Sequence, residues 1–330
     1  MRVVVIGTSN AILKDGYFYG LSDHRSVAAA SNFSIGASTS VSLPMWMKRA
    51  DFSDFDFVIL DFALNEEVWA RAGATTPRQI EDCVLGFIGS LGADGPTPVI
   101  AVLPSLTAHG DAMPIRDLYR RIAEDFGYPL FDGYEFLASL GHRLAIEPDG
   151  AFMDADHMLR HVGYAFGRTI AGALSALRPA RQRMAPAAVD MGRYRYVEAR
   201  EFALAEAEIV PRRTSLLAAE AVRLRGESVM SVALDAEAEV VGIGLNLAQS
   251  NARLEIASDR HTSVYKPNPK HFSGDGARLV YSILPLKALP GRDFRLRLAP
   301  GQPDSAAAEV IGLTIRNGCG RGAVARYRPV

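Results

Sequence analysis

The sequence predicts a three-layer α/β domain with a parallel sheet, followed by an all-β sandwich or jelly roll. Strand-like and helix-like segments alternate over the first half of the chain, as in parallel sheets covered by helices. A segment rich in Pro, Ala and Arg then follows, "RPARQRMAPAAVD" at 178–190, and indicates a linker. Beyond it, short apolar–polar runs replace the helices. We therefore expect domains at 1–178 and 191–330, joined by a linker at 179–190.

Five short apolar runs in the first half have the composition of buried parallel strands. They lie at 3–6, 31–35, 57–62, 99–103 and 129–131. Between and after them, helical patterns cover 76–91, 115–126 and 159–177. Pro77 suits the first turn of the first of these helices. In the last, apolar residues recur at the spacing that makes one face of a helix.

The second half carries six runs of alternating character, punctuated by Gly, Pro, Asn and Asp. These expected strands lie at 228–234, 240–247, 252–257, 278–284, 293–298 and 309–316. A chain of 330 residues is long for one core, which also favours two domains. We expect only a modest interface between them, the usual case for domains of one chain.

Composition excludes several classes of protein. A net charge of −1 argues against a nucleic-acid surface, which needs a basic excess. Cys83 and Cys319 lie far apart, which indicates neither a disulfide framework nor a zinc site. We find neither a signal-peptide pattern nor a run of ~18 apolar residues, so we expect a cytoplasmic protein without a membrane span. Oligomeric state cannot be predicted.

Other motifs do not indicate a cofactor. The Gly-x-Gly of 241–249 lacks a third glycine and lies among strand signals, and "NGCGRG" at 317–322 resembles a turn. No metal-ligand spacing is found among five other histidines, which are His109, His142, His161, His261 and His271. We therefore expect no cofactor and no metal.

Small polar residues follow the strands at the edge where open parallel sheets bind ligands. Ser9 follows the first strand, Gly36 the second and Asn65 the third. Asp154 and His157 stand three residues apart, just before the last helix.

Together these residues suffice for acyl transfer. Histidine can take the proton of a serine nucleophile near neutral pH, and a carboxylate on its other nitrogen fixes the tautomer. We assign these roles to Ser9, His157 and Asp154. The oxyanion needs fixed donors, which the Gly36 and Ser9 N–H groups and the Asn65 side chain can provide.

Each residue taken alone has a simpler interpretation. Ser9 could be a helix N-cap, Gly36 a turn glycine, and Asn65 the cap of a helix at 66–70. The pair Asp154 and His157 could be a surface or first-turn arrangement. The combination favours catalysis.

The chain resembles the SGNH, or GDSL-type, hydrolase family over about residues 1–177. "GTSN" at 7–10, Gly36, "ALNE" at 63–66 and "DADH" at 154–157 match its four blocks in order. The resemblance implies a flavodoxin-like layout and a Ser–His–Asp mechanism. The chain departs from the family pattern with Thr8 for Asp, Ala63 for Gly and Glu66 for Asp, and the glycine that follows the histidine block falls one residue late, at Gly163.

We expect a serine esterase or O-acyltransferase that acts on a small-molecule or saccharide acyl ester. Appended sandwiches often bind sugars, which suggests an O-acylated saccharide, although a core position is the favoured interpretation for most of the candidate aromatic residues. Those candidates are Tyr194, Tyr196, Tyr265, His271 and Tyr281. One alternative is a catalytically degenerate domain in a carbohydrate- or protein-binding protein. Another is a fatty-acyl thioesterase, which would need a long apolar groove.

Overall fold

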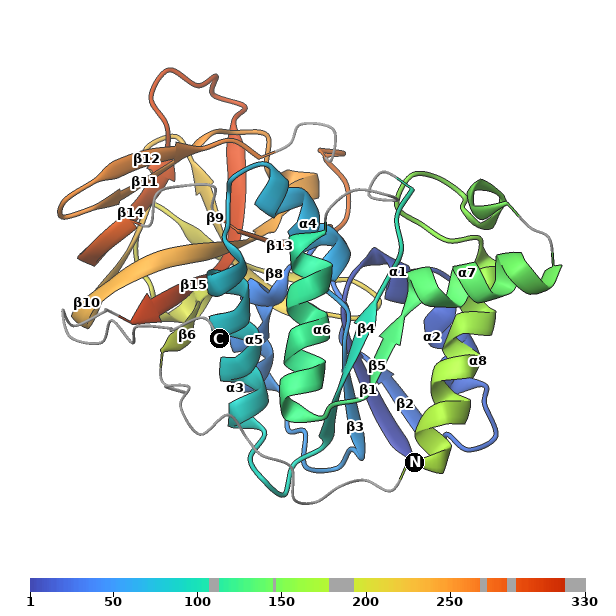
Figure 1. Cartoon of the computed structure of the whole chain (residues 1–330). Helices are drawn as coiled ribbons and strands as arrows, with labels where there is room; N and C mark the ends of the chain where they lie inside the picture. The colour runs from blue at the N-terminus through green and yellow to red at the C-terminus, as the bar shows by residue number, and fades with distance from the viewer. Residues whose placement is uncertain (107–112, 145–146, 178–192, 268–271, 284–288, 318–330) are drawn as a thin grey trace.

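Five strands form a parallel sheet in the N-terminal half, which we call the α/β half. In the computed structural model, which describes residues 1–106, 113–144, 147–177, 193–267, 272–283 and 289–317, their order is β2-β1-β3-β4-β5 (Figure 1). They are β1 (Arg2–Ile6), β2 (Ala29–Asn32), β3 (Phe57–Leu60), β4 (Thr97–Val102) and β5 (Leu130–Asp132). This is the flavodoxin-like order, whose topological switch lies between β1 and β3.

Helices cover both faces of this sheet. They are α1 (Ser9–Ile12), α2 (Tyr17–Ser22), α3 (Leu43–Arg49), α4 (Ala63–Arg71), α5 (Pro77–Ser90), α6 (Pro114–Phe126), α7 (Gly133–Leu144) and α8 (Arg160–Ala176). Alternate strand residues point to opposite faces. Val4 and Val58 thus pack with α3, α5 and α6, whereas Val3 and Phe57 pack with α2 and α8. The result is three layers (Figure 1).

The expected helices at 76–91, 115–126 and 159–177 are α5, α6 and α8, each within a residue or so of the expected bounds. The strand expected at 31–35 starts earlier and ends at Asn32. Its continuation still bonds to the β1 segment, because the Phe33 and Ile35 N–H groups donate to the Val5 and Gly7 carbonyls. The helices α2, α3 and α7 were not predicted.

The second half, residues 193–317 as described, is antiparallel and we call it the β half. Its strands are β6 (Tyr194–Glu198), β7 (Ala203–Ala205), β8 (Glu208–Arg213), β9 (Ala218–Arg225), β10 (Val229–Asn246), β11 (Leu254–Ser258), β12 (Thr262–Tyr265), β13 (Leu279–Ile283), β14 (Leu289–Leu298) and β15 (Ala307–Asn317). The two halves also contain short 3₁₀ helices, which are η1 (Ser40–Ser42), η2 (Pro148–Ala151), η3 (Ala199–Glu201) and η4 (Leu247–Gln249).

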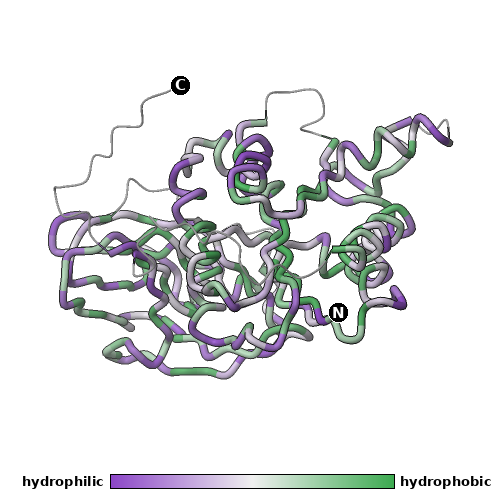
Figure 2. The backbone as a smooth tube through the Cα atoms, turned by 60° about the horizontal axis from the view of Figure 1, so that its bottom comes forward, coloured by the Kyte–Doolittle hydropathy of each residue, from purple (hydrophilic) through white to green (hydrophobic). Residues whose placement is uncertain are grey.

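The strand β10 organises the β half. It runs through both expected strands 228–234 and 240–247, so predicting two strands there was wrong. Its pairing with β14 shifts register between Ala233 and Ala238. Besides β14, the first part of β10 pairs with β7, and the later part pairs with β15 and β13. Because β10 changes partners, the ten strands share one hydrogen-bonded network around a buried core. In Figure 2, hydrophobic and hydrophilic segments alternate along these strands.

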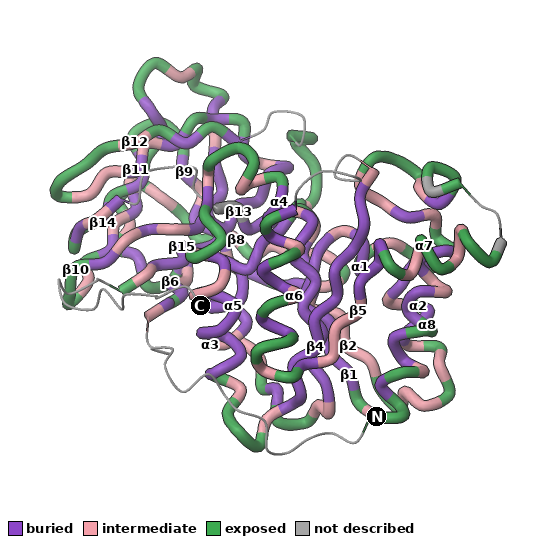
Figure 3. The backbone as a smooth tube through the Cα atoms, in the orientation of Figure 1, coloured by how far each residue is buried: buried purple, intermediate pink, exposed green. Residues whose placement is uncertain are grey.

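The two halves share a hydrophobic core, so the expected modest interface was wrong. One buried cluster contains residues of the α/β half, such as Trp46, and also seven residues of the β half. Those seven are Tyr196, Leu217, Ala219, Ala221, Leu279, Tyr281 and Ile311. Figure 3 shows buried segments in both halves. The expected linker 179–190 lies outside the described residues.

Candidate active site

Ser9 is not a helix cap. The chain leaves β1 at Ile6, Thr8 occupies the N-cap of α1, and Ser9 is the first helical residue. Its side chain is half-buried at the carboxyl end of β1, beside the topological switch. As the first N–H of a helix has no intrahelical partner, the Ser9 N–H is left for a ligand.

His157 lies against Ser9. Its Nε2 is 2.8 Å from Ser9 Oγ, and its Nδ1 is 2.9 Å from Asp154 Oδ1. Burial works to raise the pKa of Asp154, but hydrogen bonds from the Asp156 N–H and from His157 outweigh it and lower that pKa. The carboxylate is therefore ionised, and its bond to Nδ1 leaves Nε2 free to accept the serine proton.

Two contacts hold the loop that carries Asp154 and His157 over Ser9. Asn10 Nδ2 donates to the Asp156 carbonyl at 3.0 Å, and Ser105 Oγ donates to Asp156 Oδ1 at 3.0 Å. Beneath the loop, α2 and α8 approach very closely. A Cβ at Gly167 would lie 1.8 Å from the Tyr17 carbonyl oxygen, so only glycine permits this approach.

Gly36 lines the same cavity as Ser9. The backbone N–H groups of Gly36 and Ala37 have no hydrogen-bond partner among the described residues. Ala37 has a φ of 55°, a left-handed conformation that is costly for a non-glycine residue. A Cβ at Gly36 would meet only Ile12 Cδ1, at 3.8 Å, and would project into open space. The glycine thus leaves room beside Ser9, and its N–H is available for the predicted oxyanion role.

Asn65 has a different environment from the one we expected. It lies in the first turn of α4, and its Nδ2 donates to the Ser38 carbonyl at 2.7 Å. It does not line the described cavity around Ser9. Asn65 therefore stabilises the loop that carries Gly36. Its direct contact with an oxyanion stays a prediction, and the second N–H of the Asn65 amide would be the donor.

Two buried carboxyl groups lie behind the site. Asp61 follows β3, and burial raises its pKa to about 8. Glu66 in α4 accepts hydrogen bonds from the Ser40 N–H at 2.8 Å and the Tyr119 hydroxyl at 2.7 Å. Burial raises its pKa to about 7.

A cavity of about 640 Å³ opens above Ser9 and His157. Both halves of the chain line it. The α/β half contributes Ser9, Ile12, Ser34, Ile35, Gly36, Ala37 and His157, and the β half contributes Thr214, Ser215, Leu216, Leu217, Leu247, Ala277, Arg278, Leu279 and Val280. The wall from the β half is mostly aliphatic, with Thr214, Ser215 and Arg278 as its polar members.

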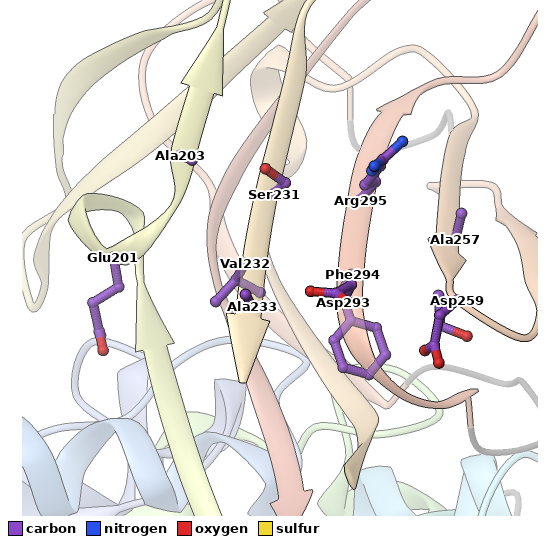
Figure 4. Close-up of a pocket in the computed structure, with 11 residues that line it drawn as sticks. Glu201, Ala203, Ser231, Val232, Ala233, Ala257, Asp259, Asp293, Phe294 and Arg295 are labelled. Atoms are coloured by element: carbon purple, nitrogen blue, oxygen red, sulfur yellow. The ribbon is translucent and has the colours of Figure 1, made fainter. Parts of the chain in front are cut away.

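A second cavity, of about 550 Å³, lies on the β half and shares no residue with the first (Figure 4). Its charged residues are exposed: Glu201, Asp259, Asp293 and Arg295. None of the residues predicted for chemistry lines it. Within the described ranges, we find no group of three or more His, Cys, Asp or Glu that could hold a metal ion, and no helix there is long and apolar enough to cross a membrane.

The tyrosines suggested for sugar binding are core residues. Tyr281 and Tyr196 are 0% and 2% exposed, and their hydroxyls are hydrogen-bonded at 2.5 Å. Tyr194 and Tyr265 are also buried. The suggestion was therefore wrong for these four residues, and His271 lies outside the described residues.

No protein-family model matches the chain, and neither does any curated protein. Among solved structures, a two-domain esterase active on acetylated mannans aligns over 96% of this chain and 91% of its own, with a TM-score of 0.67 and 13% identity. An acetyl xylan esterase covers 54% of this chain and 100% of its own length, with a TM-score of 0.43 and 16% identity. A putative lipolytic protein of the G-D-S-L family from Desulfitobacterium hafniense covers 52% of this chain and 98% of its own, with a TM-score of 0.42 and 13% identity. The likeness to the two-domain esterase shows the fold of both halves, and it agrees with the flavodoxin-like layout that the family resemblance implied for the N-terminal half.

Several supporting residues were missed by the sequence analysis. Asn10 and Ser105 hold the loop that carries Asp154 and His157. The wall of the cavity from the β half includes Thr214–Leu217 and Ala277–Val280. Asn10 directly follows Ser9 in the sequence, which was a usable signal. The others come from distant segments, and no local pattern indicates them.

Proposed function

We propose that the chain is a serine acyl-ester hydrolase that acts through a Ser9 acyl-enzyme. The observation that carries the proposal is the chain of hydrogen bonds from Ser9 Oγ to His157 at 2.8 Å and on to Asp154 at 2.9 Å. His157 takes the Ser9 proton as Oγ attacks the ester carbonyl, then gives it to the leaving alcohol. The same imidazole activates water to release the acid.

In this proposal, backbone and side-chain N–H donors stabilise the negative charge that develops on the carbonyl oxygen. The unpartnered N–H of Gly36 and that of Ser9 can bond the oxyanion, with Asn65 as the third candidate. This complete set favours catalysis over a degenerate domain that only binds. An acyltransferase would use the same acyl-enzyme with an alcohol in place of water.

The substrate we propose is an O-acetylated saccharide. The structure with the same two-domain fold is described as an esterase active on acetylated mannans, which supports this class. The cavity of about 640 Å³ exceeds what an acetyl group needs, so it can also receive part of the alcohol.

A second candidate is an ester with a longer acyl chain. The aliphatic wall of Leu216, Leu217, Leu247 and Leu279 favours this candidate, because apolar surface binds additional methylenes. Under it, the cavity receives the acyl chain instead of the alcohol.

The test is hydrolysis of p-nitrophenyl esters from acetate to octanoate, alongside acetyl release from acetylated mannan and acetylated xylan. We expect acetate to be the best acyl group and at least one polysaccharide to release acetate. Faster turnover of octanoate would favour the second candidate. If no ester is cleaved, the hydrolase proposal fails.

A further inference from the structure

Asp61 is a buried carboxyl group that the mechanism above does not use, although it lies beside the turn that connects β1 to Ser9. It follows β3 directly, and its side chain is 0% exposed. Its Oδ2 accepts hydrogen bonds from Thr8 Oγ1 at 3.4 Å and from the Tyr17 hydroxyl at 3.1 Å. Thr8 immediately precedes Ser9, so Asp61 is bonded to the residue that sets the position of the nucleophile.

The backbone of the turn from Ile6 to Thr8 packs tightly against this carboxyl group. A Cβ at Gly7 would lie 2.8 Å from Asp61 Cβ and 2.9 Å from Asp61 Oδ2, so any side chain there would displace one or the other. The Asp61 N–H also donates to the Ile6 carbonyl at 3.1 Å. Asp61 thus contacts three consecutive residues, Ile6 to Thr8, that connect β1 to Ser9.

No positive charge is found next to Asp61 in the part of the chain that the structure describes. Two hydroxyl groups face Asp61: that of Thr8, from the turn after β1, and that of Tyr17, from α2. Tyr119 from α6 lies further away, and a charge on Asp61 raises the pKa of Tyr119. The Oδ1 atom of Asp61 has no hydrogen-bond partner among the described residues. Burial raises the pKa of Asp61 to about 8, and the hydrogen bonds from Tyr17 and Thr8 act in the opposite direction. At neutral pH the group is therefore an uncharged acid, which a buried site without a cation tolerates.

We propose that Asp61 is a positioning residue: as an uncharged acid it fixes the turn from Ile6 to Thr8 and so holds Ser9 Oγ within reach of His157. The proposal rests on the proposed function, because it concerns the geometry of the Ser9 nucleophile. Ionisation places an unpaired charge behind the turn, and the turn then shifts or admits water. Activity therefore falls at alkaline pH for a reason outside the triad.

The test compares pH profiles of kcat for p-nitrophenyl acetate between pH 6 and 10, corrected for spontaneous hydrolysis. In the native chain kcat at pH 9 should be about tenfold below its value at pH 7, as for one ionisation that abolishes turnover. Asp61→Asn resembles the uncharged acid in shape and cannot ionise. We expect it to keep kcat at pH 7 within about threefold and to lose the alkaline fall.

Tyr17→Phe gives a second readout with a defined sign. The Tyr17 hydroxyl bonds the carboxylate and so lowers the pKa of Asp61. Without that hydroxyl the alkaline fall should move to higher pH, which a purely structural role would not cause. Asp132→Asn is the matched control, because Asp132 is also buried at a strand end but pairs with Arg116 at 2.9 Å. Its alkaline fall should stay where it is in the native chain.

An alkaline fall that persists unchanged in Asp61→Asn would overturn the proposal. So would a hundredfold loss of kcat at pH 7 in a variant with native circular dichroism and melting temperature. Ser9→Ala separates the two levels of the argument. If hydrolysis survives Ser9→Ala, the proposed function fails and the Asp61 proposal fails with it. If Ser9 is required and Asp61→Asn keeps the fall, only the Asp61 proposal fails.

Discussion

The proposed site has a nucleophile side, formed by Ser9, His157 and Asp154, and all three residues come from the α/β half. It also has an oxyanion side, the loop of residues 36–42 that carries Gly36, and this loop is bound to both halves. Thr314 Oγ1 donates to the Val41 carbonyl at 2.6 Å, and the Tyr281 N–H donates to Ser38 Oγ at 3.3 Å. Asn65 braces the same loop from the α/β half.

Under the proposed function, this difference places the β half in the catalytic structure as well as in substrate binding. The β half bonds to the loop that carries Gly36 and forms one wall of the cavity. Loss of the β half would also expose the core cluster that both halves share. A chain ending near Arg178 is therefore expected to lose even small-ester activity, contrary to what a detachable binding module would show.

The largest effect is expected on the nucleophile side. Ser9→Ala removes the activated nucleophile and should lower kcat for p-nitrophenyl acetate by at least ~10³. The exposed Ser22 hydroxyl, bonded only to the Tyr19 carbonyl, offers a control. Ser22→Ala should leave kcat within about twofold, as for surface changes away from a site. Native turnover in Ser9→Ala would contradict the account.

Asp154→Asn should have the next largest effect. An amide neither stabilises the imidazolium nor fixes the required tautomer, which costs about 10⁴ where the aspartate is buried. The Asp154 side chain is 56% exposed, so water screens part of its charge and we expect a loss nearer ~10² in kcat. Circular dichroism should show an intact fold. Unchanged kcat would show that this carboxylate only shapes the loop.

Asn65→Ala and Thr314→Val compare the two anchors of the oxyanion side. If Asn65 donates to the oxyanion, Asn65→Ala should cost roughly 3 kcal/mol in kcat with little change in KM. Thr314→Val keeps the shape and removes one hydrogen bond to the loop, so a loss of about tenfold or less is expected. Equal losses in the two variants would mean that both residues only brace the loop.

The smallest effect on activity is expected from Glu66→Gln, whose readout is stability. Burial raises the pKa of Glu66 to about 7, above that of an unfolded glutamate. Between about pH 4.3 and 7 the folded state therefore holds a proton that the unfolded state has lost, so stability falls as pH rises. Glutamine cannot ionise and removes this contribution. Denaturant unfolding at pH 5 and pH 8 should show a smaller decline in the variant, and an identical decline would contradict the shifted pKa.

Much of the α/β half could be predicted because its signals are local. Apolar runs marked the strands, and the residues after them, such as Ser9 and Gly36, lie at the predicted edge of the sheet. The β half was harder, since β10 passes through residues 235–239, which are Asp, Ala and Glu only, and these residue types are depleted in strands. The shared core, the brace from Thr314 and the true environment of Asn65 depend on contacts between distant segments. No local pattern encodes such contacts.

The central claim is that His157 activates Ser9 for covalent chemistry. The most direct measurement is the rate of labelling by a fluorophosphonate, with the modified residue identified by mass spectrometry, in the native chain and in His157→Ala. We predict a single adduct on Ser9 in the native chain and labelling slower by at least ~10² in His157→Ala, since general-base catalysis contributes about that much. An adduct on another residue, or equal rates in the two proteins, would contradict the account.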